Sequence, residues 1–85
     1  EFAAKYPDAK EPLDKWYAAA EKASWKNITN VRKQFPHADA IGSCTCFNIG
    51  GNKYRLIVKI KYQFQVVYIR HILTHIEYDR KLQKL

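Results

Sequence analysis

Residues 44–62 decide the fold of this chain, and they read CTCFNIGGNKYRLIVKIKY. Apolar side chains recur at every second position on both sides of the glycine pair, which is the period of a β-strand with one buried face. Gly50, Gly51 and Asn52 supply residues that tolerate the positive φ angles of a tight hairpin turn. The stretch therefore predicts two antiparallel strands whose cations, from Arg55 to Lys61, share one face.

Alternation continues after this hairpin and predicts a third strand over residues 66–72. Two side chains are expected on the basic face of that strand, Tyr68 and Arg70, and three on its core face, Val67, Ile69 and His71. The connecting turn at residues 62–65 contains no Gly, Asn or Asp, so this second hairpin is inferred from the flanking alternation alone.

The first half of the chain has helical periodicity instead. Apolar residues at i, i+3, i+4 and i+7 predict a helix over residues 11–25, with Trp16 and Tyr17 in the core. Asn27 is expected to cap a second helix that Pro36 ends, followed by a loop to Ser43. Residues 2–6 resemble the tail of a further helix closed by a proline, so the N-terminus looks cropped. These elements predict one α+β domain over residues 1–85, with N-terminal helices on one face of a curved antiparallel sheet.

Composition limits the class of protein. A chain of 85 residues with 47% hydrophobic content is expected to fold around one modest core. The sequence contains neither a long apolar run nor a signal-peptide pattern, which predicts a cytoplasmic protein without a membrane partner. Cys44 and Cys46 leave the same face of a strand too far apart for an unstrained disulfide, so free thiols are expected. A zinc site would need a second ligand pair at a recognisable spacing, so neither a metal nor another cofactor is predicted.

The charge is unevenly distributed along the chain. Of the net charge of +7, nearly all lies after residue 43, and no carboxylate occurs between Asp39 and Glu77. Lysine and arginine side chains in that window alternate with tyrosines and histidines. Cations bind phosphates and aromatic rings stack on exposed bases, so the pattern favours a single-stranded nucleic acid as the partner. The competing interpretation is a basic face that serves only for solubility.

Several spaced motifs together resemble one protein family. They are Cys46-Phe47-Asn48-Ile49, Gly51-Asn52-Lys53-Tyr54-Arg55-Leu56, Tyr68-Ile69-Arg70 and Thr74-His75-Ile76-Glu77-Tyr78-Asp79, preceded by Tyr6-Pro7-Asp8-Ala9-Lys10-Glu11-Pro12-Leu13, Trp16-Tyr17 and Trp25. This set is similar to the HigB-type toxins of bacterial toxin-antitoxin modules, in the RelE/ParE superfamily. The resemblance implies a RelE-like fold, cleavage of messenger RNA on the ribosome, and a HigA-like helix-turn-helix antitoxin as a partner. Members usually begin with a short strand and a basic stretch, which this chain lacks.

Candidate site residues follow from the chemistry of RNA cleavage without a metal. That reaction needs a group to activate the 2′-hydroxyl, cations at the phosphorus centre and a proton for the leaving oxygen. Arg70 is expected to stabilise the transition state, His75 to act as acid or base, and Tyr78 to donate a proton or stack on a base. Asp79 is expected to orient one of these groups. The predicted RNA-binding residues are Lys53, Arg55, Lys59, Lys61 and Tyr68.

Two other functions remain open at this point. One is a ParE-like relative that acts by binding gyrase and has no nuclease activity; such a protein has no need of an Arg, His and Tyr grouped on the basic face. The other is a non-catalytic RNA-binding module, which accounts for the charge and the aromatic residues but not for the spaced motifs in both halves. The endoribonuclease interpretation accounts for both.

Overall fold

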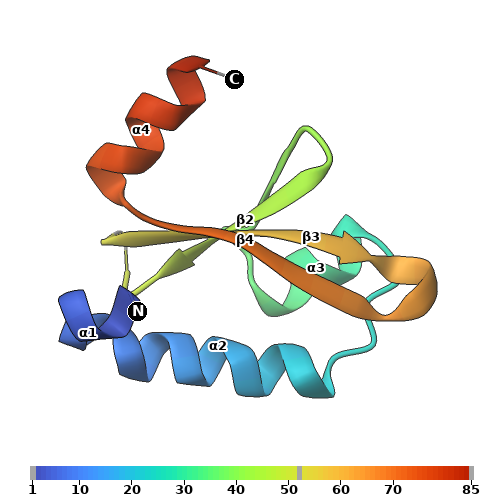
Figure 1. Cartoon of the computed structure of the whole chain (residues 1–85). Coiled ribbons are helices and arrows are strands. Elements are labelled where there is room, and N and C mark those ends of the chain that lie inside the picture. The colour runs from blue at the N-terminus through green and yellow to red at the C-terminus, as the bar shows by residue number, and fades with distance from the viewer. Residues whose placement is uncertain (1, 52, 85) are drawn as a thin grey trace.

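The structure, a computed structural model, describes residues 2–51 and 53–84. These residues form four antiparallel strands and four α-helices in an α+β fold, as the sequence predicts (Figure 1). The elements are α1 (Phe2–Lys5), the 3-10 segment η1 (Pro7–Ala9), α2 (Lys10–Lys22), α3 (Ile28–Gln34), β1 (Asp39–Ile41), β2 (Cys44–Ile49), β3 (Tyr54–Lys61), the 3-10 segment η2 (Tyr62–Phe64), β4 (Val66–Thr74) and α4 (His75–Lys84).

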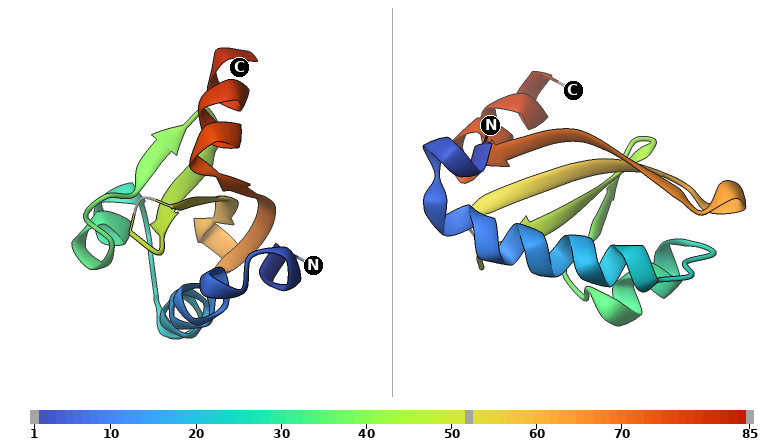
Figure 2. Two further views of the ribbon diagram at one scale, coloured as in Figure 1. Left: turned by 90° about the vertical axis from the view of Figure 1, so that its left-hand side faces the viewer. Right: turned by 60° about the horizontal axis from the view of Figure 1, so that its bottom comes forward.

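The sheet has the order β1-β2-β3-β4, so each strand pairs with its neighbours in sequence. Helices α2 and α3 lie on one side of this curved sheet, and α4 lies on the other side (Figures 1 and 2). Among the described residues, β4 has no partner strand on its outer edge. No helix in the described part of the chain has the length and apolar character needed to cross a membrane.

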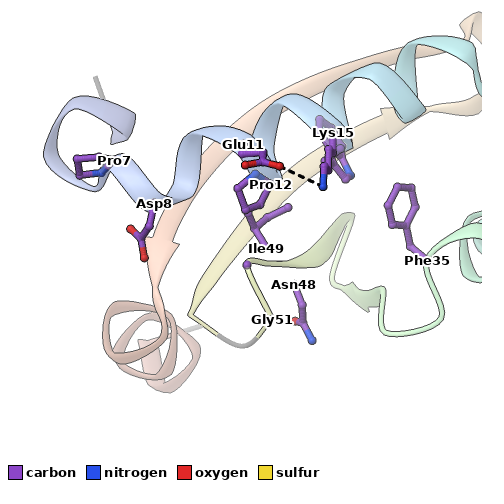
Figure 3. A pocket seen from close by; sticks show the side chains of 11 residues that line it. Pro7, Asp8, Glu11, Pro12, Lys15, Phe35, Asn48, Ile49 and Gly51 are labelled. Carbon is purple, nitrogen blue, oxygen red and sulfur yellow. Dashed lines mark ion pairs between the residues drawn. The ribbon is translucent and has the colours of Figure 1, made fainter.

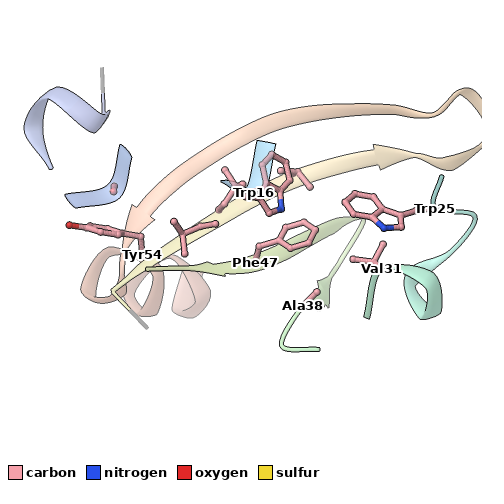
Figure 4. Close-up of a cluster of buried hydrophobic side chains, with 10 residues drawn as sticks. Trp16, Trp25, Val31, Ala38, Phe47 and Tyr54 are labelled. Atoms are coloured by element: carbon pink, nitrogen blue, oxygen red, sulfur yellow. The ribbon is translucent and has the colours of Figure 1, made fainter. Parts of the chain in front are cut away.

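The core lies between the sheet and α2 and α3 (Figure 4). Phe47 at its centre is 1% exposed, and its ring contacts three other aromatic rings, those of Trp16, Trp25 and Phe35, at centroid distances of 5.2, 6.0 and 5.1 Å. Truncation of such a side chain to alanine typically costs about 3–5 kcal/mol of stability. The alternation read from residues 44–62 therefore identifies the face that holds the fold together.

The first hairpin turn contains Gly50 and Gly51 at φ 62° and 70°, as the sequence predicts, while Asn52 lies outside the described residues. The second turn has no glycine, and Gln65 takes the left-handed conformation at φ 54° in its place. The Gln65 amide nitrogen donates to the carbonyls of Trp25, at 2.7 Å, and Tyr62, at 2.8 Å. These side-chain bonds hold a conformation that residue preference alone does not favour.

A β-bulge in β4 corrects the prediction for His71. The register pairs Val58 with Ile69 but Ile57 with His71, so Arg70 is the extra residue between them. A bulge of one residue changes which side chains face the core. His71 is therefore exposed on the α4 side of the sheet, opposite Ile57, and its predicted place on the core face is wrong. Arg70 is exposed at the bulge and, among the described residues, pairs with neither Glu77 nor Asp79.

Three details of the helical half also differ from prediction. Trp16 is buried, but Tyr17 is 59% exposed, because consecutive helical residues point about 100° apart and only one of this pair can face the sheet. Helix α2 ends at Lys22, so Trp25 reaches the core from the connector. The predicted loop before Ser43 contains the short strand β1, whose three residues are too few to show a period. The Asn27 cap is confirmed, since its side chain accepts the N–H of Asn30.

Candidate active site

Helix α4 begins at a reciprocal cap that fixes the residues of its first turn. The Thr74 hydroxyl accepts the Glu77 N–H at 3.3 Å, while the Glu77 carboxylate accepts the Thr74 N–H at 2.9 Å. This capping box satisfies two N–H groups that a helix end otherwise leaves unpaired. The His75 N–H donates to the Lys53 carbonyl at 3.0 Å and so ties the helix start to the first hairpin. Hydrogen bonds from Thr74 also hold the pKa of Glu77 below its ordinary value.

Arg55, His75 and Asp79 form a continuous chain of polar contacts. Arg55 Nη2 lies 3.1 Å from His75 Nδ1, and His75 Nε2 lies 3.4 Å from Asp79 Oδ2. A guanidinium group only donates, so Nδ1 of His75 accepts and the ring proton of the neutral histidine resides on Nε2, facing the carboxylate. Asp79 is four residues after His75 on α4, which is the spacing that brings two helical side chains together. The predicted orienting role of Asp79 has this contact as its support.

Tyr78 lies beneath the same arginine. The Arg55 guanidinium carbon is 5.5 Å from the centre of the Tyr78 ring, a cation–π distance. Burial, reinforced by a hydrogen bond with the Cys46 thiol, raises the pKa of Tyr78 to about 12, while Arg55 opposes the shift. Burial likewise raises the pKa of Cys46. Tyr78 therefore keeps its proton through the neutral range. Arg55, His75, Tyr78 and Asp79 together are named the Arg55 cluster.

A depression of about 330 Å³ opens beside the Arg55 cluster. Its lining consists of Pro36, His37, Asp39, Cys46, Asn48, Arg55 and Tyr78. Sequence reasoning assigned no role to His37, Asp39 or Asn48. Asn48 had a usable signal, because it is in register with Arg55 across β2 and β3 and so shares the face of that arginine. His37 had none, since its position depends on β1.

The remaining predicted residues lie elsewhere on the molecule. Lys59 and Lys61 follow Arg55 along β3 on the same face, and Tyr68 lies opposite Lys59 on β4. These three residues are named the basic track; at about 3.3 Å per residue, Lys61 is roughly 20 Å from Arg55 along the strand. The Lys53 side chain donates to Asp8 at 3.0 Å, so Lys53 meets the Arg55 cluster only through its backbone carbonyl, which accepts the His75 N–H. Hydrogen bonds from Tyr54 and Lys53 hold the pKa of Asp8 below its ordinary value.

A larger depression, about 670 Å³, lies on the helical side of the first hairpin (Figure 3). Asp8 and Glu11 line it, and Glu11 forms an ion pair with Lys15 at 3.3 Å. Both carboxylates are already paired with lysines, Asp8 with Lys53 and Glu11 with Lys15, and the lining contains no arginine fork for a phosphate. The smaller depression beside Arg55 therefore suits a nucleic acid better. No group of three or more metal-ligating side chains occurs within the described residues.

Comparison with known proteins identifies the family of this chain. Residues 9–81 match the HigB toxin family, described as the RelE-like toxic component of a toxin-antitoxin system. The chain belongs to the HigB toxin family. It is 32% identical over 80 residues to the mRNA interferase toxin HigB of Escherichia coli (strain K12), an alignment that covers 91% of this chain and 77% of that protein. The mRNA interferase HigB of Shigella flexneri gives the same identity and coverage. Membership in a toxin-antitoxin family implies an antitoxin as a partner.

Proposed function

We propose that this HigB-family chain is an endoribonuclease toxin that cleaves messenger RNA on the ribosome through the Arg55 cluster, without a metal ion. The observation that carries the proposal is the contact chain from Arg55 through His75 to Asp79, with Tyr78 beneath the guanidinium. Its relatives are named mRNA interferases, which supports the same activity. The carboxylate-free window along β3 and β4 supports a polyanionic substrate.

Each member of the cluster has a role that its contacts allow. The fork of donors on Arg55 binds the scissile phosphate and stabilises the charge that develops there. When the phosphate draws Arg55 away, Nδ1 of His75 is free to take the proton of the 2′-hydroxyl, and Asp79 stabilises the resulting imidazolium. The 2′-oxygen then attacks phosphorus and the bond to the 5′-oxygen breaks. Tyr78 donates its proton to that oxygen, so the products are a 2′,3′-cyclic phosphate and a 5′-hydroxyl.

This assignment moves the transition-state role from Arg70 to Arg55. Arg55 contacts both His75 and Tyr78, whereas Arg70 is at the bulge opposite the middle of β3. Leu73, the β4 partner of Arg55, is three residues beyond Arg70, or roughly 10 Å along the strand. Arg70, together with Lys59, Lys61 and Tyr68, then holds the flanking RNA. The proposed antitoxin is a HigA-like helix-turn-helix protein.

The proposed chemistry is tested with a single 2′-deoxy nucleotide. A messenger RNA that carries this substitution at the cleaved position, on a programmed ribosome, should resist cleavage while the unmodified message is cut, because the attacking oxygen is absent. Cleavage of the substituted message, or products with a 5′-phosphate, would contradict attack by the 2′-hydroxyl. In cells, induction of the toxin should shorten messenger RNA. Growth arrest with intact messages and damaged chromosomal DNA would instead favour the gyrase-binding alternative.

A further inference from the structure

We propose that the depression beside the Arg55 cluster is a nucleobase site that selects guanine next to the cleaved phosphate. This inference rests on the proposed RNA cleavage, and it assigns a ligand to residues that the reaction itself does not use. The site lies where β1, β2 and the preceding turn meet β3 and α4. Arg55 forms one wall, so a phosphate bound there places the neighbouring base within reach of the depression.

Asp39 and Asn48 present complementary groups on one face of the sheet. Asp39 is in register with Cys46, and Asn48 is two residues further along β2, so their side chains are diagonal neighbours. Such a pair is separated by about 7–8 Å, which leaves room for the edge of a base between the two polar ends. The opposite side of Asp39 is oriented by Arg32, whose Nη2 lies 3.7 Å from Asp39 Oδ1. Arg32 is held in turn by the Ala38 carbonyl at 3.0 Å.

Hydrogen-bond chemistry makes guanine the base that fits this pair. Its N1–H and N2–H₂ groups are adjacent donors, which match the two oxygens of the Asp39 carboxylate, and its O6 can accept from the Asn48 amide. Adenine and cytosine each present one donor beside an acceptor, and uracil presents one donor between two acceptors. A carboxylate repels those acceptors, so guanine alone offers it two bonds. The Asn48 amide has two N–H groups, so it can bond to O6 and retain a protein partner.

The turn before β1 supplies a wall for the base. Pro36 and His37 are exposed and line the depression opposite Arg55 and Tyr78. Histidine rings stack on the faces of unpaired bases in RNA complexes. A volume of about 330 Å³ accommodates one nucleobase with part of its ribose. The site therefore combines a histidine that can stack on a base, a polar pair that can hydrogen-bond to its edge, and an arginine that can bind the adjacent phosphate.

Binding of mononucleotides tests the site without requiring cleavage. The chain would be titrated with guanosine, adenosine, cytidine and uridine 3′-monophosphates, with the amide signals of residues 36–48 followed by NMR. Guanosine monophosphate should bind more tightly than the other three by roughly 5- to 150-fold, the range for one good bidentate base contact. Asp39→Asn should remove this preference and leave the weaker, base-independent binding to Arg55. Asn48→Asp should lower guanine affinity by repelling O6.

Glu21→Gln, a matched change of charge on α2, should keep the preference for guanine. The proposal is overturned by equal binding of the four nucleotides, by failure of all four to bind, or by an unchanged preference in Asp39→Asn. Mapped cleavage sites give an independent result, since guanine should adjoin most of them. Cleavage by attack of the 2′-hydroxyl with no guanine preference would remove this inference and leave the proposed function intact.

Discussion

The two ends of the basic face on β3 are held very differently. At the α4 end, Arg55 contacts His75 and Tyr78, and a capping box fixes the helix that carries both. At the other end, in the basic track, Lys61 and Tyr68 are exposed and Lys59 is half-buried. Chemistry requires groups fixed to within a fraction of an ångström, whereas phosphate binding tolerates mobile cations. The comparison predicts that the Arg55 cluster sets the rate and the basic track sets the affinity.

The largest expected loss of cleavage rate follows from removal of the proposed general base, His75. His75→Ala should lower the single-turnover cleavage rate on programmed ribosomes by about 10²- to 10⁴-fold, the usual contribution of a general base. Tyr78, the proposed proton donor, has a pKa of about 12, so loss of its proton should not lower the parental rate in the neutral range.

His71→Ala is the matched control, since this exposed histidine lies on the same side of the sheet and contacts Ile57 across the ladder. It should retain the parental rate to within a few-fold. Equal losses in both variants would break the comparison, because they would place the proton transfer outside the Arg55 cluster. Circular dichroism of both samples separates loss of chemistry from loss of fold.

The next effect separates two arginines. Arg55→Ala should lower the single-turnover rate by about 10²- to 10³-fold, the scale seen when one preorganised donor is lost at a developing charge. Arg70→Ala should change this rate by less than tenfold. Its main effect should be to raise the concentration of programmed ribosomes that gives half of the maximal rate. Single-turnover rates measured over a range of ribosome concentrations distinguish the two parameters. A larger loss for Arg70 than for Arg55 would restore the assignment made from sequence alone.

The strands and helices that sequence predicts well are those with strong local patterns. In residues 44–62 apolar side chains recur at every second position around two glycines, and Asn27 and Pro36 bracket α3. The weakly patterned elements are missed: β1 has three residues and no period, and the start of α4 is marked only by the Thr74 and Glu77 capping box. Local signals fix local structure, while short edge strands depend on the partner that pairs with them.

The candidate site is predicted in part. His75, Tyr78 and Asp79 come together because they share the first turns of one helix, and that spacing is visible in the sequence. Arg55 and Arg70 cannot be ranked from sequence, because a one-residue bulge in β4 decides which positions face α4. Uninterrupted alternation over residues 66–72 places His71 on the core face, whereas the extra residue Arg70 turns it to the α4 side. Bulges arise from tertiary packing and carry little local signal.

A smaller effect is expected in the basic track. Charge reversal by Lys59→Glu with Lys61→Glu should weaken RNA binding while the cleavage rate of bound RNA stays within a few-fold of the parent. Each lost phosphate contact lowers the salt dependence of binding to single strands by about 0.7, so the pair should reduce the slope by about 1.4. Binding isotherms over a salt titration measure this slope. The control pair Lys22→Glu with Lys26→Glu, on the helical side, should keep the parental slope.

The smallest effect concerns the cap that fixes α4. The folded pKa of Glu77 lies below its ordinary value of 4.5, so the stabilisation by this carboxylate is present above about pH 4.5 and is lost as pH falls through the folded pKa. Glu77→Gln keeps a side chain that can accept the Thr74 N–H but removes the charge at the helix N-terminus. Urea unfolding should show a loss of about 0.3–1 kcal/mol at pH 7, the usual value of such a charge, and a smaller loss at pH 3. Glu21→Gln, in the last turn of α2, is the control. It should not show a loss of unfolding free energy that is larger at pH 7 than at pH 3. If Glu77→Gln lowers the free energy of unfolding equally at both pH values, the cap acts through its hydrogen bonds and not through its charge. The position of His75 would then be independent of the Glu77 charge.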